Sequence, residues 1–409
     1  MKKRYSMGSC LAGAVAARAG DEMSGPALML AGFALAGSTA DASSLLAGVT
    51  ISAAAGGPVL GVLLDRAGRP GRLLAAALVL YAVGLGLILV GLDRLPFAAT
   101  VLIAVVTGLL GPALSGGWTA QLPRVVPDDR LPRANALDAM TFSAASLAGP
   151  ALAGVVAEAL GAPSAVVVSA VLIVSALPAA WLLPARPGRT RDARPGRTRD
   201  ARAASVIGDL AAGTRVIVGR PPLARATLTS IVTCVAQGML TACLPLLGER
   251  ALGGAGRGAV LLSCAAISAL VANAVLARFP RSVAPDTLIW AGALVQAAAL
   301  ALCASGRPAV LVVAVLILGA GEGPQLAALF AVRHREAPEH LRGQIFTTGA
   351  SLKITGFALG AAVAGPAANW SLPGALALAA IVAALAALVF FAVPSAKAAS
   401  SAGRAGPNS

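Results

Sequence analysis

Charged side chains stand inside two long apolar stretches of the sequence. Arg18, Asp21 and Glu22 lie within the stretch 9–37, and Glu322 lies near the middle of 308–331. If these stretches cross a lipid bilayer, each charge costs at least about 2.5–3.5 kcal/mol on insertion scales. We therefore take these residues as the first candidates for substrate binding or proton transfer.

The three charges of the first stretch are spaced to interact on one helix. Separations of three and four residues predict that Asp21 and Glu22 both reach Arg18. One Arg neutralises one acid, which leaves a carboxylate able to carry a proton; the alternative is a self-neutralising structural cluster. Asp138, about one turn inside another apolar stretch, is expected to pair with Arg residues of a loop.

Glu322 has glycines on both sides, which leave room around its carboxylate. We expect it to take part in proton coupling or substrate binding; the alternative is an ion pair with Lys353. Trp118 and Gln237 are candidates for contacts with an amphiphilic substrate in a central cavity, through stacking and hydrogen bonding. Core packing or interface anchoring explains Trp118 equally well.

The sequence contains no motif typical of enzymes. It lacks a Walker phosphate-binding loop, a Rossmann fingerprint, a G-x-S-x-G elbow and a cluster with zinc-ligand spacing. We expect no enzymatic activity, no cofactor and no metal site. His334 and His340 are expected to be solvated in a loop.

The composition excludes a soluble protein. Apolar residues make up 57% of the 409 residues and charged residues 12%, about half of the usual share. A globule cannot hide that much apolar surface, so the sequence predicts an all-α integral membrane protein, whose helices satisfy their own backbone groups in lipid. The five Cys are expected to be packing residues.

Requiring about 20 apolar residues for each crossing divides the chain into twelve spans, six before and six after a polar segment. They are 9–37, 43–64, 73–92, 97–120, 134–157, 163–183, 226–248, 257–277, 285–304, 308–331, 344–368 and 371–392.

The net charge of +15 is explained by topology. Most of the 32 Lys and Arg residues lie at the termini and in the even-numbered connections, which predicts that both termini are cytoplasmic. Nucleic-acid binding is therefore not expected. Nearly all of these residues are Arg, typical of a GC-rich genome, and we expect a bacterial plasma membrane.

The spans predict four segments: a six-helix half 1–183, a linker 184–225, a six-helix half 226–392 and a disordered cytoplasmic tail 393–409. The linker contains a perfect tandem repeat, 185–192 copied as 193–200, whose Pro, Gly and Arg content predicts disorder. A slipped duplication or a contact with anionic lipid explains the repeat. Residues 205–219 are expected to form a short surface helix.

The two halves repeat each other. An offset of 211 residues pairs Gly108 with Gly319, Arg124 with Arg335, Pro127 with Pro338, Gly149 with Gly360 and Gly154 with Gly365. Duplicated units that move about a central site are typical of secondary transporters.

The connection between the second and third spans carries a specific motif. It contains Gly61, Asp65, Arg66, Gly68, Arg69 and Arg72. We expect the glycines where the backbone turns tightly and ion pairs between the Asp and Arg residues; an ordinary positively charged loop would explain the Arg residues alone. This pattern resembles the G-x-x-x-D-R-x-G-R signature of the major facilitator superfamily (MFS), and with twelve spans the resemblance covers nearly the whole chain.

The resemblance implies a fold of two pseudo-symmetric six-helix halves, a cytoplasmic gate latch at this loop, and a cavity lined by spans one, four, seven and ten. A second element, Gly149, Pro150 and Gly154, is similar to the G-P-x-x-G-G motif of proton-driven exporters, although Ala153 replaces one Gly. The stretch 130–154 is similar to a drug and metabolite exporter branch. The Arg expected inside span four is missing.

These observations predict a monomeric secondary transporter that exports a small amphiphilic molecule in exchange for protons, in contact with membrane lipid. Proton-coupled uptake of a nutrient and a non-transporting membrane sensor are the alternatives. The mid-membrane acids argue against the sensor, and the partial exporter motif argues against uptake.

Overall fold

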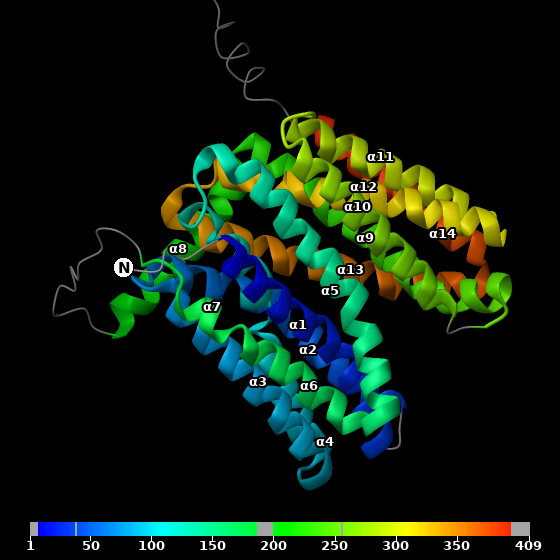
Figure 1. Ribbon diagram of the computed structural model, residues 1–409, viewed down its shortest axis with the longest axis horizontal. Coiled ribbons are helices and arrows are strands. Elements are labelled where there is room, and N and C mark those ends of the chain that lie inside the picture. The colour runs from blue at the N-terminus through cyan, green and yellow to red at the C-terminus, as the bar shows by residue number, and fades with distance from the viewer. Residues whose placement is uncertain (1–6, 37–38, 186–198, 255–256, 394–409) are drawn as a thin grey trace, which may run out of the picture. The chain divides into compact units, whose positions relative to one another are not determined.

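The protein is built almost entirely of helices (Figure 1). The computed structural model describes residues 7–36, 39–185, 199–254 and 257–393. Many helices begin with a proline at their first or second position, among them those starting at Pro70, Pro221 and Pro308. Proline fits there because the first N–H groups of a helix have no partner within it. Tight connections use glycines with positive φ, Gly161 after one helix and Gly253 after another.

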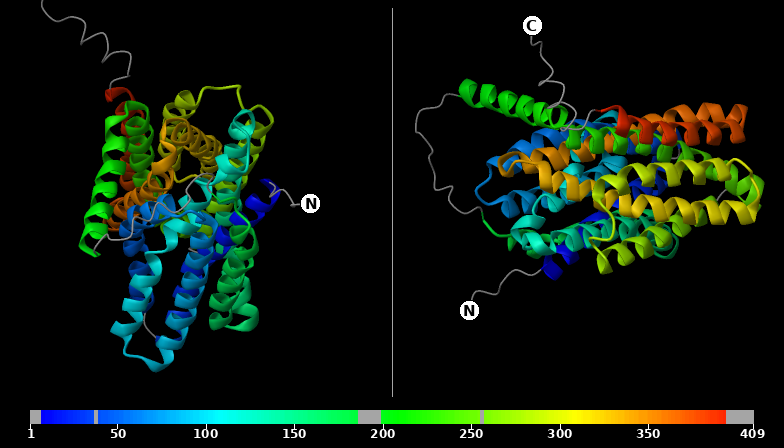
Figure 2. Two further views of the ribbon diagram at one scale, coloured as in Figure 1. Left: turned by 90° about the vertical axis from the view of Figure 1, so that its left-hand side faces the viewer. Right: turned by 90° about the horizontal axis from the view of Figure 1, so that it is seen from above.

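Contacts divide the chain into two compact units. Unit 1 comprises residues 1–210, 273–280 and 339–355. Its main helices are α1 (Met7–Ala36), α2 (Thr39–Arg66), α3 (Pro70–Arg94), α4 (Phe97–Gly108), α5 (Leu131–Leu160), α6 (Ala162–Ser175) and α7 (Leu177–Trp181). In this unit α1 packs against both α5 and α6, as all three views show (Figures 1 and 2).

The fourth predicted span is not one continuous α-helix. After α4 the chain turns at Leu109 and Leu110, becomes helical again at Gly111 and continues as a π-helix, η1 (Ala113–Gly117). The 3₁₀ turns η2 (Leu122–Arg124) and η3 (Asp128–Arg130) follow. Pro112 explains the break because it lacks an N–H to continue the α-helical bonding. A π-helical turn opens backbone carbonyl groups to other donors and often marks a functional site.

Unit 2 comprises residues 211–272, 281–338 and 356–409. Its helices are α9 (Pro221–Leu252), most of α10 (Gly258–Arg278), α11 (Pro285–Cys303), α12 (Pro308–Glu336), the later part of α13 (Arg342–Trp370) and α14 (Leu372–Ala392). The first part of α13 and the preceding turn η5 (Glu339–Leu341) belong to unit 1.

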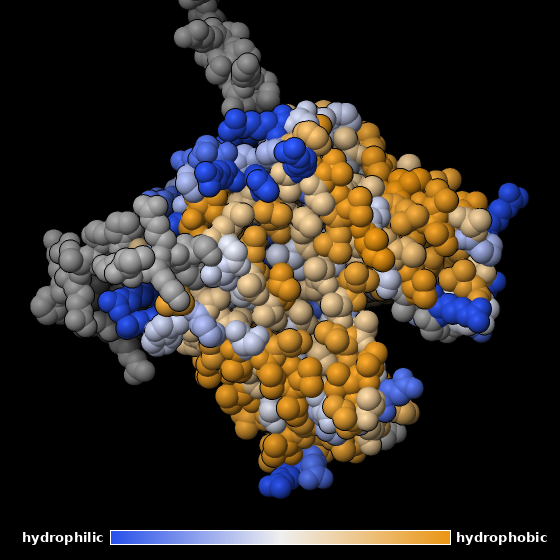
Figure 3. Space-filling model, viewed as in Figure 1, coloured by the Kyte–Doolittle hydropathy of each residue, from blue (hydrophilic) through white to orange (hydrophobic). Residues whose placement is uncertain are grey.

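Eleven helices among the described residues are long and apolar enough to cross a membrane. The first predicted span, α1, has 30 residues but carries Arg18, Asp21 and Glu22, which keep it out of that set. At 1.5 Å per residue α1 is about 45 Å long, enough to span a bilayer. Apolar residues cover the sides of the helices and hydrophilic ones gather at their ends (Figure 3).

Glycine contacts confirm the internal repeat. A Cβ at Gly108 of α4 would clash with the backbone of Val49 in α2, and a Cβ at Gly319 of α12 would clash with that of Ala265 in α10. Gly149 of α5 likewise touches α1, and Gly360 of α13 touches α9. Each pair therefore performs the same helix contact in its own unit, so the offset of 211 residues reflects a repeated packing scheme.

The linker prediction needs a correction. Helix α8 runs over Arg199–Gly219, so the helix begins earlier than the 205–219 predicted and forms much of the 184–225 linker. Most of the tandem repeat (186–198) and nearly all of the predicted tail (394–409) lie outside the described residues.

Candidate functional site

A buried ion pair holds α1 to α5 in unit 1. The Arg18 Nη1 atom lies 2.8 Å from Asp138 Oδ1, and both side chains are at most 2% exposed. The guanidinium also donates to the hydroxyl groups of Thr119 and Thr141 and to the carbonyl of Ser115, and it lies over the ring of Phe142. Thr119 donates to the second oxygen of Asp138 at 2.7 Å.

This arrangement corrects the prediction for two residues. Arg18 forms its ion pair with Asp138, which lies 120 positions away, and Asp138 is fully buried and does not face a loop Arg. The physical reason is that a buried guanidinium needs acceptors around its whole fork of donors, and α5 and the segment after α4 supply them from other directions than α1. Ser115 belongs to the π-helix η1, so the break in span four supplies one of the acceptors.

Asp21 lies beside this cluster with a different partner. The hydroxyl group of Tyr81 on α3 donates to Asp21 Oδ1 at 2.9 Å, and Ser24 Oγ lies 3.2 Å from the same hydroxyl. Within the described residues the Asp21 carboxylate forms no ion pair. Glu22, the next residue, is exposed. The first helix therefore presents one carboxyl group that is held by a neutral donor.

Unit 2 contains a chain of side-chain amides that are joined by hydrogen bonds, in contrast to the ion pair of unit 1. Gln237 Nε2 donates to Gln296 Oε1 and Gln296 Nε2 donates to Gln325 Oε1, each at 2.9 Å. Gln325 then donates to the Ile289 carbonyl. The amides of Gln296 and Gln325 are buried, while Gln237 at the start of the chain is half-buried.

Glu322 lies one helical turn before Gln325 on α12 and is half-buried between Gly321 and Gly323. The end of the amide chain and the candidate carboxylate thus share one segment of α12. The predicted alternative partner Lys353 is half-buried on α13, in unit 1. A pairing of Glu322 with Lys353 stays a prediction.

Trp118 fits the packing alternative and the placement of His334 was wrong. Trp118 is fully buried in the core of unit 1, packed so closely against Gly13 of α1 that a Cβ there would clash with its ring. A contact of Trp118 with substrate stays a prediction. His334 is 5% exposed in the last turn of α12, whereas His340 is exposed as predicted.

The predicted gate residue Asp65 holds the start of a helix. Its two carboxylate oxygens accept hydrogen bonds from the backbone N–H groups of Gly343 and Gln344, at 2.9 and 2.8 Å. These N–H groups lie in the first turn of α13, where no carbonyl of the helix reaches them and where the helix dipole favours a negative charge. The 5% exposed Asp65 therefore caps α13 within unit 1.

Arg66 has a partner outside the signature motif. Its Nε and Nη2 atoms both lie 2.8 Å from Asp209 Oδ2 on α8. The Gln344 side chain donates to the carbonyl of Leu210 on the same helix. The linker helix thus reaches the gate residues, a contact that the sequence alone did not predict because 143 positions separate Arg66 and Asp209.

The glycines of the motif act differently from the prediction. Gly61 lies inside α2, where a Cβ would clash with Gln344 and Thr347 at the start of α13. Gly68 has open space around it and no positive φ. Close helix packing thus explains Gly61, and no tight turn explains Gly68. Arg69 and Arg72 are exposed.

The two glycines of the exporter-like motif differ in how closely other helices approach them. A Cβ at Gly149 would lie 2.7 Å from the Cβ of Glu22 and 2.8 Å from the nitrogen of Met23, so Gly149 permits the contact of α5 with α1. Pro150 and Gly154 are exposed, and a Cβ at Gly154 would meet nothing within 4 Å. The motif therefore places α5 directly against the acidic segment of α1.

A family model of the Major Facilitator Superfamily matches residues 10–348. The chain belongs to the major facilitator superfamily. This MFS chain is 26% identical over 345 residues to the uncharacterized MFS-type transporter y4rN of Sinorhizobium fredii, covering 82% of each chain.

Solved structures share the fold. The human organic anion transporter MFSD10 (TETRAN) aligns with a TM-score of 0.75 at 16% identity, covering 95% of this chain and all of that one. A bacterial homologue of the iron transporter ferroportin, in an outward-facing state, aligns with a TM-score of 0.74 at 14% identity, covering 94% and 98%.

Membership of the superfamily makes this chain a multi-pass membrane protein of small-molecule transport. Its fold is the MFS fold of twelve membrane helices in two pseudo-symmetric halves. The carboxyl groups and amides described above are thus the polar interior of a transporter.

Proposed function

We propose that this MFS protein exports a small amphiphilic molecule across the bacterial plasma membrane in exchange for protons, working as a monomer by alternating access. The observation that carries the proposal is the separation of roles on α1. Arg18 is neutralised by Asp138, while Asp21 is held by the neutral hydroxyl of Tyr81.

This separation fits a proton carrier. Because Asp21 forms no ion pair with a described residue, it can gain or lose a proton without breaking one. Tyr81 can donate to the ionised carboxylate or accept a hydrogen bond from the protonated carboxyl group, so its position serves both states. Glu322, beside the amide chain of unit 2, is the second proposed proton carrier or the group that binds a cationic part of the substrate.

The proposed direction rests on α5. Gly149 brings the exporter-like segment against α1 at Glu22, next to Asp21. A change in the protonation of Asp21 would therefore act where α1 and α5 are most closely packed, and tight packing transmits small shifts.

The proposed gate is the capping of α13 by Asp65. The two hydrogen bonds from Gly343 and Gln344 would hold the cytoplasmic side closed and would have to break for it to open. Asp65→Asn keeps one acceptor and loses the charge, so we expect it to change the turnover rate more than substrate affinity.

The test is collapse of an acid gradient in inside-out vesicles exposed to a panel of antibiotics, siderophores, sugars and amino acids. Collapse by a compound, lost in Asp21→Asn and Glu322→Gln and retained in the exposed control Asp93→Asn, would support proton-linked export. If no compound acts although insertion is verified, or if both variants retain the response, the proposal is wrong.

A further inference from the structure

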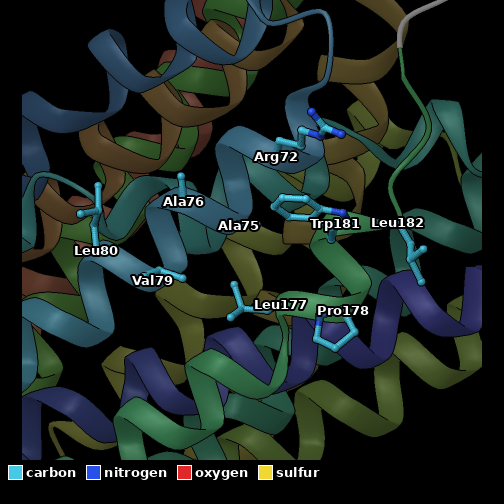
Figure 4. Close-up of a pocket in the computed structure, with 9 residues that line it drawn as sticks. All are labelled: Arg72, Ala75, Ala76, Val79, Leu80, Leu177, Pro178, Trp181 and Leu182. Atoms are coloured by element: carbon cyan, nitrogen blue, oxygen red, sulfur yellow. The ribbon is translucent and has the colours of Figure 1, made fainter.

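A groove on the membrane-facing surface of unit 1 lies between α3 and α7 (Figure 4). It encloses about 750 Å³, within the range typical of ligand pockets. Its lining is apolar except at one end, where Arg72 and Trp181 lie together. All of its lining residues belong to one unit.

The sequence explains why a groove forms here. Gly71 lets the start of α3 approach the backbone of Ala180 so closely that a Cβ would clash, and the buried Ala75 forms the floor next to it. Pro178 lies directly after the interruption between α6 and α7, where it lacks an N–H to continue the helical bonding. Small residues thus form the base of the groove, and larger apolar side chains form its two sides.

The apolar walls of the groove are exposed. Leu80 is 58% exposed, Trp181 59% and Leu182 64%. From Arg72 to Leu80 the groove follows eight residues of α3, or about 12 Å, close to the ~15 Å of hydrocarbon in one leaflet. Lipid is the surrounding solvent of these helices, so an acyl chain is the natural occupant of the apolar part.

The polar end selects the headgroup. Arg72 is exposed and forms no ion pair within the described residues; its guanidinium lies 5.2 Å from the centre of the Trp181 ring. A guanidinium forms strong paired hydrogen bonds with phosphate oxygens. Arg72 lies against one face of the indole and places a positive charge at this end of the groove, which favours an anionic headgroup over a zwitterionic one.

We propose that this groove binds one anionic phospholipid, with the phosphate on Arg72 and an acyl chain along α3 toward Leu80. The lipid comes from the leaflet on the side of the Arg66–Arg72 connection. Its binding would tie the first turn of α3 to the end of α7, and it does not depend on the direction of transport or on proton coupling.

The test uses the full chain in nanodiscs of phosphatidylcholine with increasing amounts of phosphatidylglycerol that carries brominated acyl chains. Bromine quenches a nearby indole, and the part of the quenching that is lost in Trp181→Phe reports on the groove. We expect this part to saturate at a low fraction of phosphatidylglycerol. Arg72→Gln should raise the half-saturating fraction at least about tenfold, as expected for the loss of a charge-assisted hydrogen bond to the phosphate.

Two matched controls make the result decisive. Arg69→Gln removes the same charge from the same connection and should change half-saturation less than twofold. Ala76→Phe fills the groove and should remove the Trp181 signal, whereas Val83→Phe, at an exposed position of α3 beyond the groove, should not. Equal quenching by brominated phosphatidylcholine, or equal effects of Arg72→Gln and Arg69→Gln, would overturn the proposal.

Discussion

The two units of this transporter share their helix packing but differ in their polar interiors. Equivalent glycines make equivalent contacts, Gly149 in unit 1 and Gly360 in unit 2. In contrast, unit 1 contains a buried ion pair, Arg18 with Asp138, whereas unit 2 contains a chain of neutral amides in addition to the buried Arg333.

The offset of 211 residues shows that the polar side chains of one unit have no polar equivalent of the same kind in the other. Arg18 corresponds to Thr229 and Asp138 to Gly349, while Gln296 corresponds to Leu85 and Gln325 to Leu114. Backbone contacts tolerate few residue types, so the glycines are the same in both units. The polar side chains of the interior, in contrast, differ between the two units. We infer that unit 1 is held by a fixed ion pair, and that the amides of unit 2 can exchange partners without separating charge.

The largest predicted effect comes from breaking the ion pair. Asp138→Asn leaves the Arg18 guanidinium buried without a counter-charge, which should reduce the free energy of unfolding by about 3–5 kcal/mol. Thermal unfolding of the detergent-solubilised protein measures this effect. Asp93→Asn, which changes an exposed carboxylate, is the control.

Replacing both Arg18 and Asp138 distinguishes the cost of an unpaired buried charge from the cost of changed packing. The double variant Arg18→Met with Asp138→Leu should recover most of the lost stability, because no buried charge remains unpaired. If Asp138→Asn unfolds at the temperature of the Asp93→Asn control, the ion pair does not stabilise unit 1.

The shared packing predicts matched effects in the two units. Gly149→Ala and Gly360→Ala each place a methyl group against the backbone of a neighbouring helix, which should cost about 1–3 kcal/mol. Gly154→Ala and Gly365→Ala have open space and should stabilise their helices by about 0.5–1 kcal/mol. The same sign at the two equivalent positions of each pair, with opposite signs between the two pairs, would support the repeat in thermal unfolding; equal effects of all four changes would contradict it.

Breaking the amide chain of unit 2 should reduce the free energy of unfolding by less than most of the changes above. Gln296→Leu leaves a donor of Gln237 and an acceptor of Gln325 without their partner, which should cost about 1–2 kcal/mol in unfolding. Gln237→Leu removes only the half-buried end of the chain and should cost less. An effect of Gln237→Leu as large as that of Gln296→Leu would argue against a continuous chain.

The smallest predicted effect is at the linker helix. Asp209→Asn removes the ion pair with Arg66, whose side chains are 32% and 46% exposed, so stability should change by less than about 1 kcal/mol. A rate effect that disappears at high salt is expected in transport assays, because salt screens exposed charges. Asp129→Asn, another exposed acid, serves as the control, and equal effects of the two changes would exclude a special role of α8.

The sequence predicts what depends on composition and periodicity. The spans and the repeat offset follow from apolar length and glycine spacing. The ion pairs expected between Asp65 and the Arg residues of its connection do not follow, because Asp65 accepts hydrogen bonds from the first turn of α13 and Arg66 pairs with Asp209. The partner of Arg18 does not follow, because local spacing on α1 favours Asp21 and Glu22 while the folded unit supplies Asp138 from α5. The burial of His334 was missed for a similar reason: residue type indicates polarity, but the neighbouring helices decide burial.

The contact of Arg66 with Asp209 does not follow from the sequence. Disorder is predicted for the tandem repeat and a short surface helix for 205–219, and α8 (Arg199–Gly219) covers that range. Weak periodicity predicts a helix but does not predict its neighbour, which lies 143 positions away in the sequence.

The central claim is that Asp21 couples substrate movement to protons while Arg18 and Asp138 hold the structure. The direct measurement compares two activities of purified Asp21→Asn in proteoliposomes, using a substrate found in the vesicle screen: exchange of labelled for unlabelled substrate, and transport driven by a proton gradient. We predict that exchange persists, because the ion pair and the packing are intact, and that gradient-driven transport is lost. Gradient-driven transport at the unmodified protein's rate would contradict the account.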